Sequence, residues 1–414
     1  MNKKKIINDP VYGFITIPSD FIFDLIEHPF LQRLRYIKQL SMSHLVYPGA
    51  LHTRFQHALG ALHLMALAID TLRSKQIDIS PEEEEAVFIA ILLHDVGHGP
   101  FSHSLEHTLV EGVSHECLSL LMMDELNRQF GGRLTLAIDI FQNRYPKHFL
   151  HQLVSGQLDI DRMDYLNRDS FFTGVSEGVI SFDRIIKMLY VVDNELVVEQ
   201  KGIYSVENFL IARRLMYWQV YLHKTVINAE QMLLNILRRA KALYGIGKTL
   251  YASPSLEHFL RNRVTERNFR EDVSHLAHFT HLDDTDIWSA IKVWATDSDP
   301  ILSMLCSRLI ARKLYHIELH RLEPDQQHIN LLKAQAVRHF GVEPDLSDYF
   351  VWTNSIANSA YEPTEGSIKI YMKDGSLQDI LDASDLSNLV ALSRKVTKFA
   401  VSFPKELLDS SLPA

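Results

Sequence analysis

The spacing of apolar residues along the chain predicts a mainly helical protein. From Ser19, a suitable helix N-cap, apolar side chains recur at helical intervals as far as Leu40. Residues 46–57 pass through a Pro-Gly turn into a strongly apolar helix. Another helix is expected to begin at Ser80, because the proline and four glutamates that follow it suit a first helical turn. Three segments alternate like short hairpins: 5–18, 190–204 and 366–376. The pattern predicts an all-α fold with short antiparallel β-hairpins.

The second half of the chain continues the helical pattern. A helix is expected from Ser205 to about residue 243, and the composition stays globular and helical beyond it. We see no internal repeat, low-complexity linker or phosphate-binding glycine loop. We expect a core over residues 1–240 and a C-terminal, mostly helical lobe over residues 241–414 packed on that core. Beyond residue 245 the sequence by itself carries no recognisable chemistry.

Composition and charge argue against several classes of protein. The chain is 46% hydrophobic and 22% charged, as soluble globular proteins are. Its net charge of −9 argues against nucleic acid as the main partner, because such binding depends on basic patches. The 2 cysteines imply no disulfide framework, and the charged N-terminus lacks the apolar stretch of a signal peptide. No apolar run is long enough to span a membrane. We therefore expect a cytoplasmic protein.

The strongest chemical signal is the segment 89–103, which reads I-A-I-L-L-H-D-V-G-H-G-P-F-S-H. Its apolar run ends in His94 and Asp95, and burying such groups is costly unless a metal or a partner compensates. His57, at the start of a buried helix, and Asp161, in an acidic helix, are candidates for the missing ligands. Taken singly, His57 would more often be a satisfied core residue and Asp161 a solvated one. The His94–Asp95 pair favours a metal site.

Two further stretches carry unusual polar patterns. Two tyrosines flanked by two cations recur at intervals of four, four and three residues, on one face of a helix: Arg213, Tyr217, Tyr221 and Lys224. Aromatic stripes usually pack, but cations at both ends suit a pocket for a base and phosphates. Residues 32–36 are unusually basic, for which a solvated helix face is the simpler explanation.

Several strings follow one another in an order that a known family shares. His57, then His94 and Asp95, then Asp161 match the H…HD…D pattern of the HD-domain metal-dependent phosphohydrolases. Within that family the chain resembles the deoxynucleoside triphosphate (dNTP) triphosphohydrolases, which include bacterial dNTPases and an animal enzyme with a SAM domain. The matching strings, which lie between residue 3 and about residue 230, are N-D-P, Q-R-L-R-Y-I-K-Q-L, P-G-A-x-H-x-R-F-x-H, H-D-V-G-H-G-P-F-S-H and D-x-D-R-M-D-Y-L-x-R-D.

The resemblance implies a metal-dependent reaction that releases a deoxynucleoside and inorganic triphosphate. The four residues of the H…HD…D pattern would hold a divalent ion (Mn, Fe, Ni, Zn or Mg), and Mg could also accompany the nucleotide. His103 would be the general acid with Glu106 beside it, and His115 would contact the phosphates. The implied substrate contacts are Arg54, Arg162, Arg213 and Lys224 for phosphates, and Gln39, Leu40, Tyr165, Asp169 and Tyr221 for the sugar. Tyr217 stands where relatives commonly have histidine.

The resemblance also implies regulation and assembly. In regulated members a guanine nucleotide, GTP or dGTP, binds between subunits, which would make this chain a homodimer or homotetramer. The matching residues are Lys5, Asp9, Glu27, Gln32 and Arg35, with glutamate at 27 in place of aspartate; a plain surface helix explains them equally well. Two other functions stay open: a phosphohydrolase acting on a nucleotide phosphomonoester or signalling nucleotide, and a non-catalytic nucleotide sensor. The residues do not select the metal or the preferred dNTP.

Overall fold

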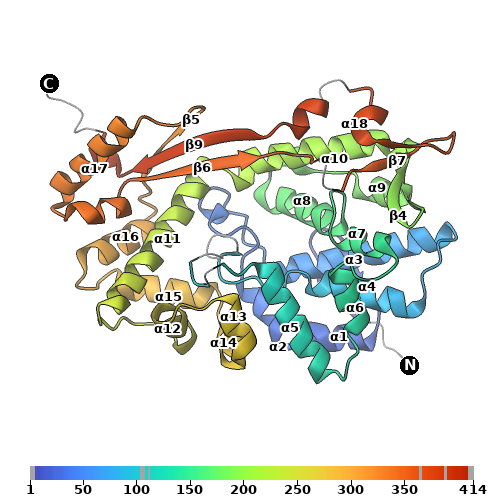
Figure 1. The fold of residues 1–414 in the computed structure, drawn as a ribbon, viewed down its shortest axis with the longest axis horizontal. Coiled ribbons are helices and arrows are strands. Elements are labelled where there is room, and N and C mark those ends of the chain that lie inside the picture. Colours follow the sequence, from blue (N-terminus) through green and yellow to red (C-terminus); the bar gives the residue numbers. More distant parts are fainter. Residues whose placement is uncertain (1–4, 103–107, 111, 363–365, 387–388, 409–414) are drawn as a thin grey trace.

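A computed structural model describes residues 5–102, 108–110, 112–362, 366–386 and 389–408. In these residues the chain is predominantly helical with short antiparallel strand pairs, which confirms the predicted fold class. Figure 1 shows the N-terminal helices on one side of the molecule and helices α12 to α17 on the other, with a three-stranded sheet along one edge. None of the described helices is both long enough and apolar enough to cross a bilayer.

The helices differ widely in length, and the longest lie next to the candidate chemistry. They are α1 (Asp20–Glu27), α2 (Pro29–Gln32), α3 (Arg54–Ser74), α4 (Pro81–Leu93), α5 (His115–Gln129), α6 (Thr135–Phe141), α7 (His148–Val154), α8 (Ile160–Thr173), α9 (Phe182–Met188), α10 (Ile203–Met216), α11 (Lys224–Gly245), α12 (Pro254–Arg261), α13 (Glu266–Glu271), α14 (Val273–Phe279), α15 (Asp284–Trp294), α16 (Pro300–Ile310), α17 (Gln326–Phe340) and α18 (Ile380–Ala383).

The strands form three small sheets. One is the hairpin of β1 (Ile6–Asp9) and β2 (Gly13–Thr16). A second has the order β3-β4-β7-β8, with bounds β3 (Leu189–Val192), β4 (Glu195–Glu199), β7 (Lys369–Tyr371) and β8 (Leu377–Asp379). The third places β9 (Val396–Phe403) between β5 (His316–His320) and β6 (Trp352–Asn358), all antiparallel. The three predicted hairpins are present, whereas β5, β6 and β9 were not predicted.

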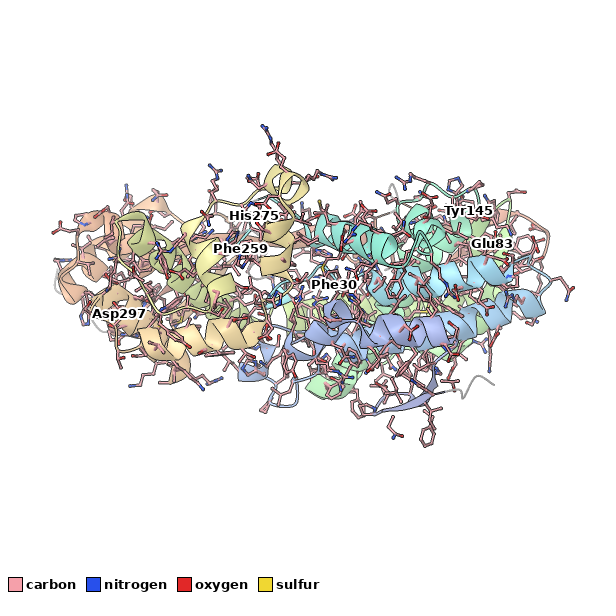
Figure 2. All side chains as sticks on the ribbon, turned by 90° about the horizontal axis from the view of Figure 1, so that it is seen from below. Phe30, Glu83, Tyr145, Phe259, His275 and Asp297 are labelled. Atoms are coloured by element: carbon pink, nitrogen blue, oxygen red, sulfur yellow. The ribbon has the colours of Figure 1, made fainter. Side chains whose placement is uncertain are left out.

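The helix α4 begins as its sequence predicts. Ser80 Oγ accepts the N–H of Glu83 at 3.2 Å, and a carboxylate oxygen of Glu83 accepts the N–H of Ser80 at 2.8 Å, which closes a capping box. The other carboxylate oxygen of Glu83 accepts the hydroxyl of Tyr145 at 2.6 Å, and these two side chains lie close together in Figure 2. The N-terminal end of α4 is therefore fixed, so its far end reaches His94 and Asp95 in a defined position.

Two predicted continuous helices are interrupted in the structure. The helix expected from Ser19 to Leu40 is broken at Pro29, because proline lacks the N–H that would bond the preceding turn, and it ends in a 3₁₀ turn at Arg33–Tyr36. The helix expected from Ser205 to about 243 is broken between α10 and α11 by a π-helical turn at Tyr217–Tyr221. Lys224 therefore starts a new helix instead of extending the stripe of Tyr217 and Tyr221.

The two parts of the chain are interleaved. Helix α11 runs through residue 240, where the boundary between core and lobe was expected, and packs against both α12 and α16. In the other direction, β7 pairs in parallel with β4, so residues near 370 join a hairpin near residue 198. Seen from below in Figure 2, the yellow segment that carries Phe259 and His275 lies between Asp297 and Phe30.

Helix α3 crosses α4 and α8, and Gly60 makes the crossing with α8 possible. A Cβ at Gly60 would lie 2.1 Å from the Arg168 guanidinium and 2.1 Å from a carboxylate oxygen of Asp164. Those two side chains form an ion pair at 2.9 Å and are fully buried. The absence of a side chain at Gly60 therefore leaves the space that this buried pair occupies.

We expect Gly60→Ala to destabilise the protein, although alanine is favoured over glycine in a helix by about 1 kcal/mol. The added methyl group must displace the buried pair, and breaking such a pair costs about 3–5 kcal/mol. Urea unfolding should show a net loss of roughly 2 kcal/mol or more. The matched control is Gly245→Ala in α11, where a Cβ would meet nothing within 4 Å, and this variant should be neutral or slightly more stable. Equal stability of the two variants would contradict the packing argument.

Candidate metal centre and adjoining cleft

Three helices bring the four predicted metal ligands together. His57 lies in the first turn of α3, whose N-terminus is closed by a capping box between Thr53 and Gln56. His94 and Asp95 follow the last residue of α4, and Asp161 lies in the first turn of α8. His57, His94 and Asp95 are buried, with exposed fractions of 0%, 9% and 7%.

The separations between the ligand atoms fit a single ion. His57 Nε2 lies 3.1 Å from Asp161 Oδ1 and 3.4 Å from His94 Nε2, and His94 Nε2 lies 3.3 Å from Asp161 Oδ1. Asp95 Oδ1 lies 3.4 Å from His94 Nε2. Ligand bonds of about 2.1 Å in a tetrahedral arrangement separate neighbouring ligand atoms by about 3.4 Å. His57, His94 and Asp161 therefore place their ligand atoms close enough together to hold one divalent ion, whereas Asp95 groups with His98 and His115 and would add its carboxylate from that side.

Hydrogen bonds behind the histidines orient their rings. The Nδ1 atom of His57 lies 2.7 Å from Asp164 Oδ2, and that of His94 lies 2.7 Å from the carbonyl of Ile91. Both partners can accept a hydrogen bond from Nδ1–H, which directs each Nε2 at the centre, as metal-binding histidines require. The sequence alone assigned no role to Asp164.

A chain of buried ion pairs continues outward from Asp164. Arg168, one turn further along α8, bonds Asp164 at 2.9 Å and Asp9 at 2.7 Å. Asp9 also accepts the N–H groups of Val11 and Tyr12, which close the turn of the β1–β2 hairpin. Asp9, which was expected near a regulatory nucleotide, thus has its carboxylate bonded in the interior.

Without a metal ion, burial and neighbouring charges shift the pKa values of three of the candidate ligands. Burial lowers the pKa of His57, but hydrogen bonds to Asp161 and Asp164 outweigh it and raise that pKa to about 10. Burial opposes charging of His94 too, yet Asp95 raises its pKa. The pKa of Asp95 is lowered to about 2, because His94 and Arg54 outweigh its burial. In the metal-free protein both imidazoles therefore tend to be protonated, and a bound metal ion would displace these protons.

A cleft of about 780 Å³ opens beside the centre. His94, Asp95 and Asp161 form one part of its wall. Nine of the predicted substrate and phosphate contacts also line it, namely Gln39, Leu40, Arg54, His115, Arg162, Tyr165, Asp169, Tyr217 and Tyr221. Arg213 is buried and bonds Gln157 at 3.1 Å, and Lys224 is exposed; neither lines the cleft. His103 and Glu106 lie outside the described residues.

A hydrogen-bonded group forms the end of the cleft near α8. Asp169 accepts the hydroxyl of Tyr221 at 2.8 Å and lies 2.7 Å from Nε2 of His52. His52 is 2% exposed and stacks on Phe172 with ring centroids 4.5 Å apart. Sequence reasoning missed His52, although it lies in the matching string P-G-A-x-H-x-R-F-x-H. The amide oxygen of Gln39, beside this group, is buried and has no hydrogen-bond partner among the described residues.

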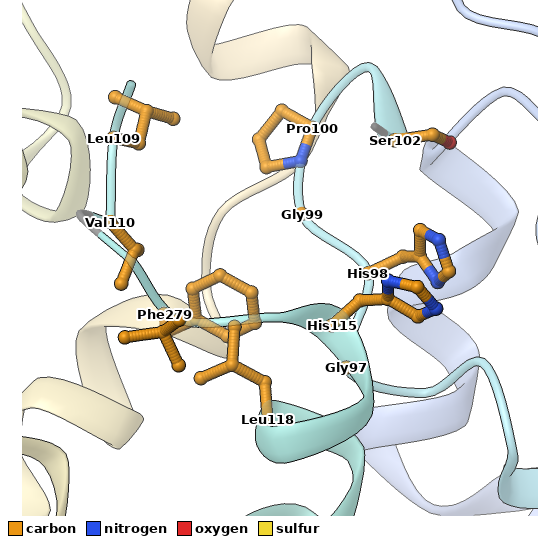
Figure 3. A pocket seen from close by; sticks show the side chains of 11 residues that line it. Gly97, His98, Gly99, Pro100, Ser102, Leu109, Val110, His115, Leu118 and Phe279 are labelled. Carbon is orange, nitrogen blue, oxygen red and sulfur yellow. The ribbon is translucent and has the colours of Figure 1, made fainter. Parts of the chain in front are cut away.

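Two histidine rings lie side by side where the loop after Asp95 meets α5. The centroids of His98 and His115 are 3.9 Å apart, and Figure 3 shows both rings directed away from the apolar side chains of Leu109, Val110 and Leu118. Those apolar residues enclose a pocket of only about 20 Å³ behind the rings, which is the space of about one water molecule. The pocket therefore backs the cleft wall and does not form a second substrate site.

Known proteins resemble the chain along its whole length. The HD domain matches residues 54–169, and an HD associated region matches residues 180–245. A phosphohydrolase of Bacteroides thetaiotaomicron of known structure is 53% identical, with a TM-score of 0.93, over 96% of this chain and 99% of its own. The uncharacterized protein YwfO of Bacillus subtilis is 30% identical over 99% of this chain and 94% of its own.

This chain belongs to the HD-domain phosphohydrolases. Among its relatives is the human deoxynucleoside triphosphate triphosphohydrolase SAMHD1, which is 31% identical over 53% of this chain and 42% of its own length. The homologue from Dictyostelium discoideum is 32% identical over 59% of this chain and 51% of its own. The HD domain begins at Arg54 and ends at Asp169, so it contains all four candidate metal ligands.

The raised pKa of His57 predicts opposite pH dependences for stability and metal affinity. In metal-free protein, its proton stabilises the fold fully below about pH 6.5, and this stabilisation is lost as pH rises toward 10. Thermal unfolding in chelator should therefore show falling stability from pH 6.5 to 8.5. Metal affinity should rise over the same range, by about tenfold per pH unit for one displaced proton.

A matched variant identifies the group responsible. Asp161→Asn removes a carboxylate that raises the pKa of His57, so the stability of metal-free protein should depend less on pH in this variant. Metal-free wild-type stability that is flat or rising between pH 6.5 and 8.5 would contradict the assignment.

Proposed function

We propose that this HD-domain protein hydrolyses deoxynucleoside triphosphates to deoxynucleosides and inorganic triphosphate with a divalent metal. The observation that carries the proposal is the cleft, which is lined both by three of the four candidate metal ligands, His94, Asp95 and Asp161, and by Gln39, Asp169 and Tyr221. Its volume of about 780 Å³ is in the range of small-molecule sites. The similarity to SAMHD1 supports the choice of substrate.

The metal ligands would hold an ion that polarises a phosphate oxygen and generates hydroxide from water near neutral pH. His57, His94, Asp95 and Asp161 suit Mn, Fe, Ni, Zn or Mg, and Mg could also accompany the nucleotide. The contribution of the protein is to hold both imidazoles with Nε2 toward the ion and to keep both carboxylates ionised.

The cleft offers cations for the phosphates close to the metal centre. Arg54 pairs with Asp95, and Arg162, which is partly exposed, lies 3.4 Å from Asp159 and 3.9 Å from Asp161. His115 lies on the same wall. Such groups stabilise the charge that develops on phosphate oxygens in the transition state. The family resemblance also assigns phosphate contacts to Arg213 and Lys224, which do not line the cleft in this structure.

The leaving 5′-oxygen needs a proton, which a nearby histidine can supply. We assign this step to His103 with Glu106 beside it, on the basis of the family resemblance.

The far end of the cleft suits a deoxyribose. The unpartnered oxygen of Gln39 can accept a sugar hydroxyl, as can Asp169, and Tyr165 lies edge-on to Tyr221 with centroids 6.1 Å apart. Tyr221 is held by its bond to Asp169, so it cannot swing aside for a 2′-hydroxyl without losing that bond. With Leu40 on the cleft wall, this arrangement favours a deoxynucleotide over a ribonucleotide. Tyr217, edge-on to Tyr221 at 5.1 Å, would face the base.

The direct test of the proposed function is product analysis. We expect protein supplied with Mn²⁺ or Mg²⁺ to convert each active dNTP into deoxynucleoside and triphosphate, and to leave the matching ribonucleotide largely intact. The His94→Ala/Asp95→Ala variant should be inactive. Orthophosphate or pyrophosphate as product would assign the protein to a different phosphohydrolase reaction. Metal binding without any turnover would favour a nucleotide sensor.

We further propose a regulatory guanine nucleotide site at the surface that carries Gln32 and Arg35, formed between subunits of a homodimer or homotetramer. Arg35 donates to the amide oxygen of Gln32 at 2.7 Å and lies over the ring of Phe55 at 3.6 Å. Glu27 is exposed on the preceding helix, and Lys5 lies over Phe23. The carboxylate of Asp9 is bonded to Arg168 and to the N–H groups of Val11 and Tyr12.

Loss of the Arg35 side chain should remove a dependence on GTP. In this proposal GTP or dGTP raises the dNTPase rate and the molecular mass of wild-type protein, and Arg35→Ala abolishes both effects while keeping basal metal binding. Arg128→Ala, at an exposed arginine of α5, is the matched control. A GTP response that survives Arg35→Ala would show that the residue belongs to a plain surface helix.

A further inference from the structure

One buried carboxylate of the C-terminal lobe bonds the loop that follows the candidate ligand Asp95. Asp284 is the first residue of α15, and its side chain is only 4% exposed. One of its oxygens accepts the N–H of Phe101 at 2.8 Å, and the other accepts the N–H of Lys38 at 3.1 Å. A single side chain from the lobe thus joins the loop that follows Asp95 to the segment that precedes Gln39.

This carboxylate is not needed to cap its own helix. The cap is Asp283, whose side chain accepts the N–H of Thr285 at 2.6 Å and whose own N–H is bonded by Asp286 at 2.9 Å. Ile287, Ile291 and Trp294 anchor α15 in the core. Asp284 therefore places its carboxylate in the interior, where it bonds the backbone of segments that are distant in the sequence.

The turn that Asp284 holds has a strained backbone. Phe101 and Ser102 have φ values of 55° and 54°, in the left-handed region that residues with side chains seldom adopt. Such conformations persist only where the surroundings impose them, and they cluster at functional sites. Here Asp284 bonds the backbone of Phe101, the first of the two strained residues.

The turn leads directly to a metal ligand. The hydroxyl of Ser102 accepts Nε–H of Arg54 at 2.7 Å and donates to the carbonyl of Lys38 at 3.1 Å. The terminal nitrogen Nη1 of Arg54 pairs with the carboxylate of Asp95. Asp284, Ser102 and Arg54 thus form a continuous path of contacts from the lobe to Asp95.

A second contact ties the same lobe segment to the start of the same loop. The buried guanidinium of Arg33 donates to the carbonyl of His98 at 2.8 Å and to that of Leu282 at 3.3 Å. The loop after Asp95 is therefore bonded to residues 282–284 at two points. Arg33 bridges the carbonyls of His98 and Leu282, and Asp284 accepts the N–H of Phe101.

We propose that Asp284 is a positioning residue of the metal centre: it imposes the turn at Phe101 and Ser102 and thereby orients Arg54 and the ligand Asp95. The C-terminal lobe then has a defined part in the site, because the geometry of Asp95 depends on a residue about 190 positions away in the sequence. The claim rests on the proposed metal centre but not on the identity of the substrate.

The test uses Asp284→Asn in the full chain, with Asp283→Asn as the matched control. Asparagine keeps the shape of the side chain but loses one acceptor, so one of the two backbone N–H groups is left unpaired. We expect a fall of about tenfold in Mn²⁺ affinity, measured by chelator competition, and a similar fall in kcat with KM nearly unchanged. Asp283→Asn, which can still cap α15, should behave as wild type.

Ser102→Ala interrupts the contacts between Asp284 and Arg54 without changing a residue of the C-terminal lobe. This variant also provides a test if Asp284→Asn does not fold. It should lower Mn²⁺ affinity to a similar extent, and the two changes combined should cost less than the product of their separate effects, because both act through Arg54. Unchanged Mn²⁺ affinity in the folded Asp284→Asn protein, or fully multiplicative effects in the double variant, would overturn the proposal. Wild-type protein that binds Mn²⁺ but hydrolyses no dNTP would refute the proposed substrate alone.

Discussion

The buried contacts from His57 through Asp164 and Arg168 to Asp9 are the constraint on which the site depends. Charged groups in an interior are tolerated only when each is paired, and breaking one pair leaves its partner uncompensated. Here the pairs join α3, α8 and the β1–β2 hairpin, so the helices that carry His57 and Asp161 are fixed relative to one another. Gly60 is the feature of α3 that makes room for the pair.

The cleft divides into two ends with different chemistry. At the metal end, Arg54, Asp95 and the paired rings of His98 and His115 place positive charge and titratable groups together. At the other end, Asp169 lies within hydrogen-bond distance of both His52 and Tyr221. The proposed substrate, a deoxynucleoside triphosphate, has the same division into a charged tail and a hydroxylated ring.

The sequence predicts the parts of the site that are local. The helical fold, the three hairpins and the cap at Ser80 follow from periodicity and turn residues, and the candidate metal site was suggested by an apolar run that ends in His94 and Asp95. What it could not provide are contacts across long separations: Arg168 to Asp9 over 159 residues, His52 to Asp169 over 117, and Phe101 to Asp284 over 183. The π-helical turn before Lys224 has no simple signature either, because its residues also fit an ordinary helix.

The central claim is that His57, His94, Asp95 and Asp161 hold one metal ion, and elemental analysis of the purified protein tests it most directly. After incubation with Mn, Fe, Ni, Zn or Mg and removal of free ion, we expect about one equivalent of a divalent metal per chain, and none in His94→Ala/Asp95→Ala. The matched control is Asp272→Ala/His275→Ala, which removes an aspartate–histidine pair of the C-terminal lobe with 3.9 Å between its atoms and should keep the metal. Equal metal content in the two double variants, or none in the wild type with any of these ions, would contradict the account.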